Sequence, residues 1–268
     1  MPEISYTYAR ADWLSSTAVV LVEPQGPLNI GAVCRAMANF GFHDLRLVNP
    51  QTDHLCDEAR RMAVKAGSIL EQARVYPDLG QALADTSYAF ATTRRFGRYR
   101  EDFVSPAQIG EVLAELDTSA PAALVFGRED RGLLTEELDL CQRFITIPTS
   151  DELPSMNLAQ AVCLCVYELA GARARSAGKA PGVRSFANNA TVEAMFAHMR
   201  TTLTRAGYLD ESNPDHILRS FRRIFGKNGL TERDVRILRG LWSRIDWLNA
   251  QLDTVLHESE NSGSDSNV

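Results

Sequence analysis

The sequence of 268 residues contains no run that approaches about 18 uninterrupted apolar residues, so we expect no membrane-spanning helix. Its first residues, MPEISYTYARADWL, contain no basic region leading into an apolar stretch, so we expect no secretory signal. The five cysteines show no CxxC spacing and lie mostly within apolar patterns. Such cysteines are typical of buried free thiols, which predicts a protein of the reducing cytoplasm.

Common ligand-binding motifs are absent as well. No GxGxxG follows the first apolar run and no GxxxxGK[ST] is present, so the sequence lacks both the dinucleotide fingerprint and the P-loop. No GxSxG turn for a nucleophilic serine is present. The five histidines form no HExxH pattern and have no CxxC partner, so we predict no metal site. A nucleotide-like cofactor would have to be bound by other means.

The net charge of −6 argues against indiscriminate binding to nucleic acid, yet basic residues gather locally. Residues 217–244 carry eight Lys and Arg but only two acidic side chains, and the three arginines at 219, 222 and 223 share one side of a predicted helix. Residues 94–100 place four arginines beside Phe96 and Tyr99, which suits phosphates and stacked bases. A solvated or salt-bridged surface is the alternative for both groups. The candidates for RNA contact are Arg94, Arg95, Arg98, Arg219, Arg222, Arg223, Lys227 and Arg236.

Short apolar runs alternate with helical patterns over the first 175 residues. The runs are continuous, so we predict strands that are buried on both faces and therefore parallel. Strands that alternate with helices predict a doubly wound α/β domain, with a mostly parallel sheet and helices on both faces. We expect strands at 18–22, 45–48, 88–91, 123–126 and 144–147. We expect helices at 30–40, 57–66, 79–84, 106–116, 135–141 and 157–175.

The composition changes after residue 175. Residues 176–189, SAGKAPGVRSFANN, carry Gly, Pro, Ser and Asn with no apolar period, which is typical of a linker. Three helical patterns follow, near 191–206, 215–225 and 231–256, and the last residues are polar. We therefore predict an α/β domain (1–175), a linker (176–190), a helical extension (191–256) and a disordered tail (257–268).

Two strand ends carry an unusual set of polar residues. The strand at 123–126 runs into FGREDRGLL, and the strand at 144–147 runs into IPTSDELPSMN before a long apolar helix. Loops at the carboxyl ends of strands hold ligands in open α/β sheets, so we predict a binding site here. The first strand ends in EPQGPLNIGAVCR, where Asn29 could cap a helix and Arg35 interrupts its apolar pattern. An Arg at such a position needs an anionic or carbonyl partner, or a route to solvent.

The segments NIGAVCR, FGREDRGL and IPTSDELPSMNLAQAV resemble, in order and spacing, the motifs of SPOUT RNA methyltransferases. The sequence is most similar to the TrmJ-like group, which methylates a ribose 2′-hydroxyl in the tRNA anticodon loop. The similarity extends to the basic segment RSFRRIFGKNGLTERDVRILRGLWSRIDWL. It implies S-adenosylmethionine as cofactor, a C-terminal deep trefoil knot in the α/β domain, and a homodimer with active sites at the subunit interface. It also implies a cytidine or uridine at position 32 of the tRNA as the target.

The resemblance further implies roles for single residues. It implies that catalysis depends on Arg35, Asn29, Glu129, Ser155 and Asn157, with Arg35 acting as a base or stabilising the developing alkoxide. It implies that the cofactor is held by Thr92, Gly127, Arg128, Ile147, Met156 and Leu158. Structural alternatives stay open: a tight turn for Gly127, a surface carboxylate for Glu129, helix capping for Ser155 and Asn157, and a core position for Leu158.

Other functions stay open at this point. A SPOUT enzyme could methylate another RNA, such as ribosomal RNA, or a base atom in place of a ribose. A non-catalytic RNA-binding relative is a further alternative, although the presence of all five candidate catalytic residues argues against it. The long basic extension favours the tRNA enzyme. Methyl transfer from a sulfonium requires no metal.

Overall fold

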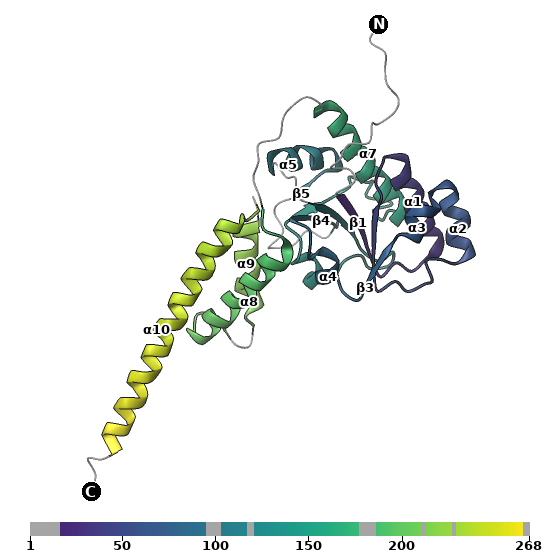
Figure 1. Ribbon diagram of the computed structural model, residues 1–268. Helices are drawn as coiled ribbons and strands as arrows, with labels where there is room; N and C mark the ends of the chain where they lie inside the picture. The colour runs from purple at the N-terminus through teal and green to yellow at the C-terminus, as the bar shows by residue number, and fades with distance from the viewer. Residues whose placement is uncertain are drawn as a thin grey trace.

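Seven strands form one sheet in the part of the chain that the computed structural model describes, which comprises residues 17–94, 103–116, 121–176, 186–210, 213–226 and 229–264. Every pairing in this sheet is parallel, and the strand order is β3-β2-β1-β6-β4-β7-β5. The strands are β1 (Thr17–Val22), β2 (Asp44–Val48), β3 (Arg74–Tyr76), β4 (Tyr88–Thr92), β5 (Phe103–Val104), β6 (Ala122–Phe126) and β7 (Arg143–Ile145). The predicted parallel α/β fold is therefore confirmed (Figure 1).

Strand β1 shows why these strands are continuously apolar. All six of its residues are buried. Val19 and Leu21 belong to one core cluster, whereas Val20 and Val22 belong to a second. The clusters lie on opposite faces of the sheet, because successive side chains of a strand point in opposite directions. A strand that is buried on both faces has no polar side to alternate with.

Different helices cover the two faces of the sheet. The core cluster that includes Val19 also includes residues of α1 (Pro27–Asn39), α2 (Asp57–Ala63), α3 (Gly67–Glu71), α5 (Ile109–Leu116) and α7 (Leu158–Ser176). The cluster on the other face includes residues of α4 (Leu79–Leu83) and α6 (Thr135–Leu138). Two short 3₁₀ helices, η1 (Val64–Ala66) and η2 (Pro106–Gln108), precede α3 and α5. The sheet is therefore the middle of three layers.

Helix α1 begins after the short loop that follows β1, and it packs closely on α2. Gly26 is its N-cap and Pro27 occupies its first position, where a missing N–H costs nothing. Asn29 thus lies inside the first turn and does not cap the helix, so the capping alternative for Asn29 is wrong. A Cβ atom on Gly31 would lie 2.3 Å from the carbonyl oxygen of Ala59, so the approach of α1 to α2 requires glycine.

Three further helices follow: α8 (Asn189–Arg205), α9 (Asp215–Gly226) and α10 (Glu232–Ser264). Their apolar residues form a third core cluster, and α10 packs along α8 before extending past its end (Figure 1). Helix α8 begins inside the predicted linker, because Asn188 caps it by accepting from the Thr191 N–H at 2.8 Å. Helix α10 extends to Ser264, whereas the sequence predicts a disordered tail from residue 257. That segment contains no proline, and its first glycine is Gly263.

Polar contacts join the helical extension to the sheet domain. The Asn189 side chain donates from Nδ2 to Thr86 Oγ1 at 2.9 Å and accepts from Gln142 Nε2 at 3.2 Å. Its backbone N–H also donates to Thr86 O at 2.7 Å. Arg219 of α9 pairs with Asp139 at 2.8 Å. The extension is therefore anchored beside the segment that leads into β7.

None of the described helices is long and apolar enough to cross a membrane. The five cysteines are free thiols. Burial raises the pKa of the Cys34 thiol to about 12, so this thiol is unreactive at neutral pH.

Candidate active site

A cavity of about 360 Å³ lies at the carboxyl ends of β4, β6 and β7. Cavities of roughly 300–1,000 Å³ are typical of small-molecule sites, so this one is large enough for a nucleoside-sized ligand. It is lined by Thr92, Thr93, Arg94, Phe126, Gly127, Arg128, Glu129, Asp130, Arg131, Gly132, Leu133, Ile145, Ile147, Thr149, Pro154, Ser155, Met156, Leu158 and Ala161. The predicted site at the ends of these strands therefore coincides with a cavity.

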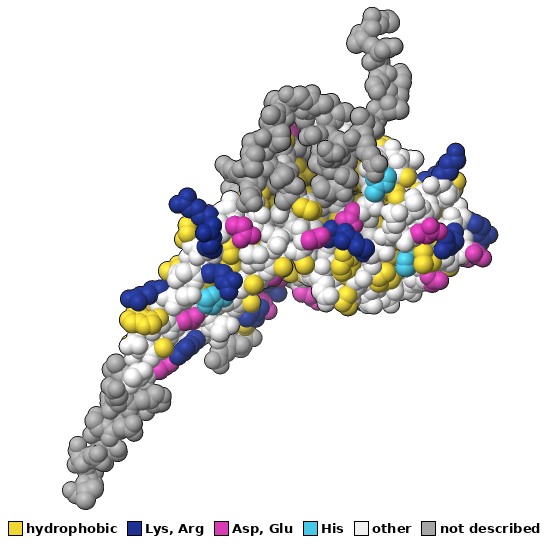
Figure 2. Space-filling model, in the orientation of Figure 1, with side chains coloured by type: hydrophobic (Ala, Val, Ile, Leu, Met, Phe, Trp, Pro, Cys, Tyr) yellow, Lys and Arg dark blue, Asp and Glu magenta, His cyan; other side chains and the backbone are white. Residues whose placement is uncertain are grey.

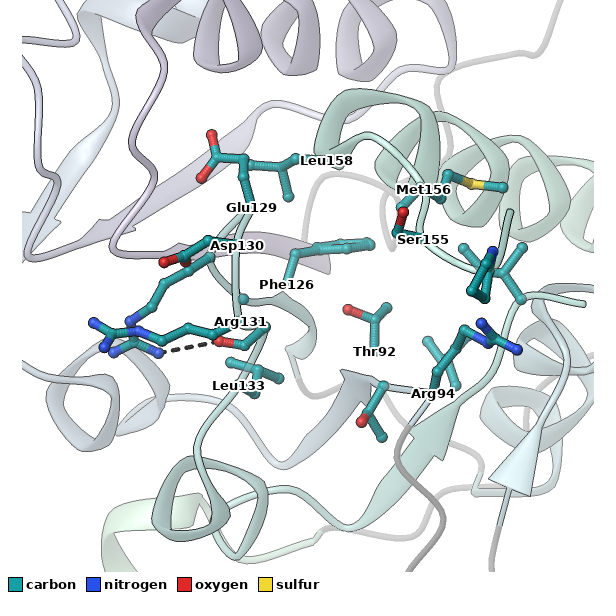
Figure 3. Close-up of a pocket in the computed structure, with 18 of the residues that line it drawn as sticks. Thr92, Arg94, Phe126, Glu129, Asp130, Arg131, Leu133, Ser155, Met156 and Leu158 are labelled. Atoms are coloured by element: carbon teal, nitrogen blue, oxygen red, sulfur yellow. Dashed lines mark hydrogen bonds between the residues drawn. The ribbon is translucent and has the colours of Figure 1, made fainter. Parts of the chain in front are cut away.

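The walls of the cavity combine apolar surfaces with hydroxyl groups and with five charged residues, Arg94, Arg128, Glu129, Asp130 and Arg131. Figure 3 shows Thr92, Phe126 and Ser155 around a common central space, with Met156 at its edge. Thr92 Oγ1 donates to Val125 O at 3.0 Å, which ties one wall to strand β6. The apolar parts of the wall suit the faces of a planar ring, and the hydroxyl and charged groups suit the polar parts of a ligand.

All six residues predicted to hold the cofactor line this cavity. The backbone packing also requires a glycine at position 127, because a Cβ atom there would lie 2.2 Å from the backbone carbon of Gly132. Gly132 itself has φ +68° and forms a bridge with Arg128, so residues 127–132 make a tight turn. The tight-turn alternative for Gly127 therefore holds, and the turn forms one wall of the cavity.

Arg128 differs from the other five, because its guanidinium is bound by the protein. Nε donates to Glu23 at 2.6 Å, and Nη2 and Nη1 donate to Glu137 at 2.8 and 3.0 Å. Nη1 also donates to Gly132 O at 3.2 Å. The side chain is buried, and these bonds raise the pKa of Arg128 and lower the pKa of Glu23. The geometry thus gives Arg128 a structural task at the cavity wall, because four of its five N–H donors are used by Glu23, Glu137 and Gly132.

Hydrogen bonds among Asn29, Glu129 and Asn157 join the three recognised motifs. Asn29 Nδ2 donates to Glu129 Oε1 and Asn157 Nδ2 donates to Asn29 Oδ1, both at 2.9 Å. Glu129 also accepts from the backbone N–H groups of Gln25 and Gly26 at 3.0 and 3.2 Å. Three segments are therefore held together at one side of the cavity, with Asn29 lying 100 positions from Glu129 and 128 positions from Asn157 in the sequence.

Asn157 also caps helix α7. Its Oδ1 accepts from the backbone N–H groups of Ala159 and Gln160 at 2.9 and 3.3 Å. The capping alternative is therefore correct for Asn157, whose amide nitrogen serves the link to Asn29 at the same time. Ser155 does not cap the helix: it is exposed, lines the cavity and has no hydrogen bond to any described residue.

Arg35 lies outside the cavity. Its side chain is exposed on α1 and has no polar partner within the described part of the chain. The Arg35 guanidinium is therefore solvated, which explains how an arginine fits into an otherwise apolar helix. Within one chain, the structure brings together four of the five candidate catalytic residues and leaves Arg35 apart.

The candidate RNA-binding residues have varied surroundings. Arg94 lies at the rim of the cavity, and Arg236 is exposed on α10. Arg219 is paired with Asp139, and Arg222 is paired with Glu193 and lies 4.5 Å above the Phe196 ring. Arg223 is partly buried on α9. Arg95, Arg98 and Lys227 lie outside the described residues. The salt-bridged alternative therefore applies to Arg219 and Arg222.

Sequence reasoning missed Glu23 and Glu137, which hold Arg128. Glu23 follows β1 directly and has a positive φ of 46°, a conformation that non-glycine residues rarely adopt. For Glu23, the sequence did offer a signal, namely a carboxylate directly after a buried strand. Among the described residues, no group of three or more His, Cys, Asp or Glu could hold a metal ion.

Comparison with known proteins identifies relatives over most of the chain. Residues 16–167 match the SpoU rRNA methylase family, and residues 190–255 match the C-terminal domain of tRNA methyltransferase TrmJ. A tRNA (cytidine/uridine/adenosine-2′-O-)-methyltransferase TrmJ from Pseudomonas aeruginosa (strain UCBPP-PA14) is 35% identical over 239 residues, which cover 85% of this chain and 93% of that protein. A tRNA (cytidine/uridine-2′-O-)-methyltransferase TrmJ from Sodalis glossinidius (strain morsitans) is 32% identical over 238 residues, which cover 87% and 92%. The crystal structure of TrmJ from Z. mobilis ZM4 has a TM-score of 0.74 at 34% identity and covers 86% of this chain and 99% of that chain.

Proposed function

Because the chain belongs to the SpoU methylase family and, within it, to the TrmJ group, we propose that it methylates a ribose 2′-hydroxyl of tRNA with S-adenosylmethionine as donor. The observation that carries this proposal is the hydrogen-bonded junction of Asn29, Glu129 and Asn157 beside a nucleoside-sized cavity. The junction brings the three family motifs to one place, as a shared active site requires.

The cavity fits the cofactor in size and chemistry. Apolar side chains such as Ile147, Met156 and Leu158 suit the purine, and the hydroxyl of Thr92 and the backbone of the Gly127 turn supply polar groups. When bound, the cofactor supplies an electrophilic methyl group on a sulfonium. The residues that line the cavity would hold the cofactor and exclude water from it.

The chemical difficulty lies in the nucleophile, because a ribose hydroxyl is a weak acid. Holding the hydroxyl close to the methyl group contributes several kcal/mol, up to about 7–11 in favourable cases. Ser155 lines the cavity with an uncommitted hydroxyl, and we assign it to orienting the ribose. We assign Arg35 to stabilising the developing alkoxide, because a guanidinium holds its proton too tightly to be a good base alone.

Arg35 would reach this position from a second subunit. It follows Leu28 by two helical turns, so both lie on the same exposed side of α1. Leu28, Leu164 and Tyr167 are 50%, 39% and 48% exposed, and α1 packs on α7, so the two helices present one apolar surface. We propose that this surface is the homodimer interface and that it delivers Arg35 to the site of the partner subunit.

The target is proposed to be a cytidine or uridine at position 32. The relatives support a pyrimidine, although the Pseudomonas protein is also named for adenosine. Ribosomal RNA is the second candidate, because the family model carries that name. The match of residues 190–255 to a tRNA methyltransferase domain favours tRNA. We propose that this helical extension, with exposed Arg236, holds the tRNA while Arg94 contacts the target nucleotide.

We also propose that the α/β domain is knotted. Strand β7 pairs with both β4 and β5, although β5 precedes it in the chain. Helix α7 then packs against α1 and α5. Insertion of a late strand between two earlier ones, followed by a helix that packs on earlier helices, supports a threaded chain, which few protein folds contain. We place the enzyme in the cytoplasm, where its free thiols stay reduced.

The direct test incubates the protein with unmodified tRNA transcripts and S-adenosylmethionine, followed by digestion and mass spectrometry of nucleosides. A 2′-O-methylpyrimidine in the anticodon loop is the expected product. Methylation of ribosomal RNA alone would assign the second candidate, and tRNA binding without methylation would indicate a non-catalytic protein. Arg35→Ala should abolish turnover and leave cofactor binding intact, whereas Arg61→Ala, on the exposed side of α2, should change neither.

A further inference from the structure

Helix α10 carries a heptad pattern that the proposed activity does not use. Apolar residues recur at spacings of three, four, three and four, at Leu238, Leu241, Ile245, Leu248 and Leu252. We call these five residues the α10 seam. A 3.5-residue repeat on an α-helix is the pattern by which helices pair as coiled coils.

The fold of one chain leaves most of the α10 seam uncovered. Leu238 and Ile245 pack at the edge of the third core cluster, beside α8. Leu241, Leu248 and Leu252, in contrast, are 50%, 46% and 60% exposed. Figure 2 shows hydrophobic and basic side chains side by side on the surface of this projecting part of the molecule. Exposed apolar side chains at regular spacing on one helix indicate a contact surface.

The charges along α10 favour one orientation for a partner helix. Residues 232–245 carry four arginines and two acidic side chains, whereas residues 246–260 carry four acidic side chains and no Lys or Arg. Two of these four, Asp246 and Asp253, also pair with His198 and Arg205 of α8. Two parallel copies of α10 would place like charges together along their whole length. Two antiparallel copies would place the basic half of each helix beside the acidic half of the other.

We propose that the α10 seam binds the α10 seam of a second copy of this chain in antiparallel orientation. The spacing is symmetric under this arrangement: Leu241 meets Leu252 of the partner subunit, and Ile245 meets Leu248 of the partner subunit. The contact is isologous, as a two-fold dimer requires, and extends over about 22 Å of helix. It is separate from the α1–α7 surface and does not depend on methyl transfer.

Disulfide cross-linking tests both the contact and its orientation. The full chain with Leu241→Cys and Leu252→Cys should form a covalent dimer under oxidation, visible without reductant on a denaturing gel. Neither single variant should do so, because in the antiparallel pair two copies of position 241 lie about 16 Å apart along the axis. A disulfide needs Cα atoms within about 7 Å. Mixing the two single variants should restore the cross-link.

The matched control is Arg239→Cys with Thr254→Cys, which has the same symmetry but lies on the other side of the helix. This pair and the unsubstituted chain should give no covalent dimer. Cross-linking by each single variant would establish parallel pairing and overturn the proposed orientation. No cross-link in any variant would overturn the proposal, and protection of Leu241→Cys from a maleimide by added tRNA would then assign the seam to RNA.

Discussion

Replacing Arg128 with Met tests whether this residue positions the cavity wall or contacts the cofactor. The change leaves Glu23 and Glu137 without their shared partner. Removing one member of a buried ion pair costs about 3–5 kcal/mol. The Glu23 and Glu137 side chains are 24% and 13% exposed, so water compensates in part and we expect about 3 kcal/mol, the low end. That loss lowers the melting temperature by roughly 6–12 °C in a protein of this size.

The measurement combines thermal unfolding by circular dichroism with calorimetric titration of S-adenosylmethionine well below the transition. We expect reduced stability together with weaker cofactor binding, because the turn at 127–132 forms the wall. Arg131→Met is the matched control: Arg131 is 57% exposed and its nearest Glu23 oxygen is 3.6 Å away, so its change should cost under about 0.5 kcal/mol. Unchanged stability in Arg128→Met with loss of cofactor affinity would refute this reasoning and establish direct contact with the cofactor.

Three further predictions concern other parts of the molecule. Asn157→Ala should lose about 1 kcal/mol of stability with the α7 cap and should lower turnover; Asn157→Asp, which keeps the capping oxygen, should retain the stability in thermal unfolding but not the turnover. The pKa of Glu23 is lowered from its ordinary value of 4.5, so its pairing stabilises the fold above about pH 4.5 and is lost as the pH falls through the lowered value. The melting temperature of the unsubstituted chain should therefore fall more steeply in acid than that of Arg128→Met. Arg233 is exposed on α10 three residues before Arg236. Replacing both with Ala should weaken tRNA binding, lower the slope of its salt dependence by about two units and leave cofactor affinity unchanged in titrations.

The central strands could be predicted from sequence, because burial on both faces leaves a continuous apolar run. Strands β3 and β5 could not. Arg74 and Val75 in β3 are exposed, and β5 has only two residues, so neither strand carries a periodic signal. Both lie at the edges of the sheet, where a strand pairs with only one neighbouring strand and its other edge faces solvent. Their placement depends on pairing with β2 and β7, which a local pattern does not encode.

The candidate site was predictable as a location, because polar residues followed two buried strands. The partners of single residues were not. Arg128 reaches Glu23 across 105 positions of sequence, and nothing in the local pattern around Arg128 specifies that contact. Arg219 and Arg222 show the same limit: helical spacing places them on one side of α9, but Asp139 and Glu193 face that side. A periodic pattern gives the direction of a side chain and leaves its partner undetermined.

The link between Asn29, Glu129 and Asn157 is better explained by position than by stability. Glu129 and Asn157 are exposed, and hydrogen bonds between groups that water can reach contribute only about 0.5–1.5 kcal/mol each. A stabilisation of that size does not explain why the Glu129 carboxylate accepts three hydrogen bonds. The bonds do fix the loops after β1, β6 and β7 relative to each other, within a distance at which an error of about 1 Å costs a large factor in rate. The sheet and the Arg128 ion pairs supply rigidity, and we propose that this polar link uses that rigidity to set the geometry in which a hydroxyl meets a methyl group.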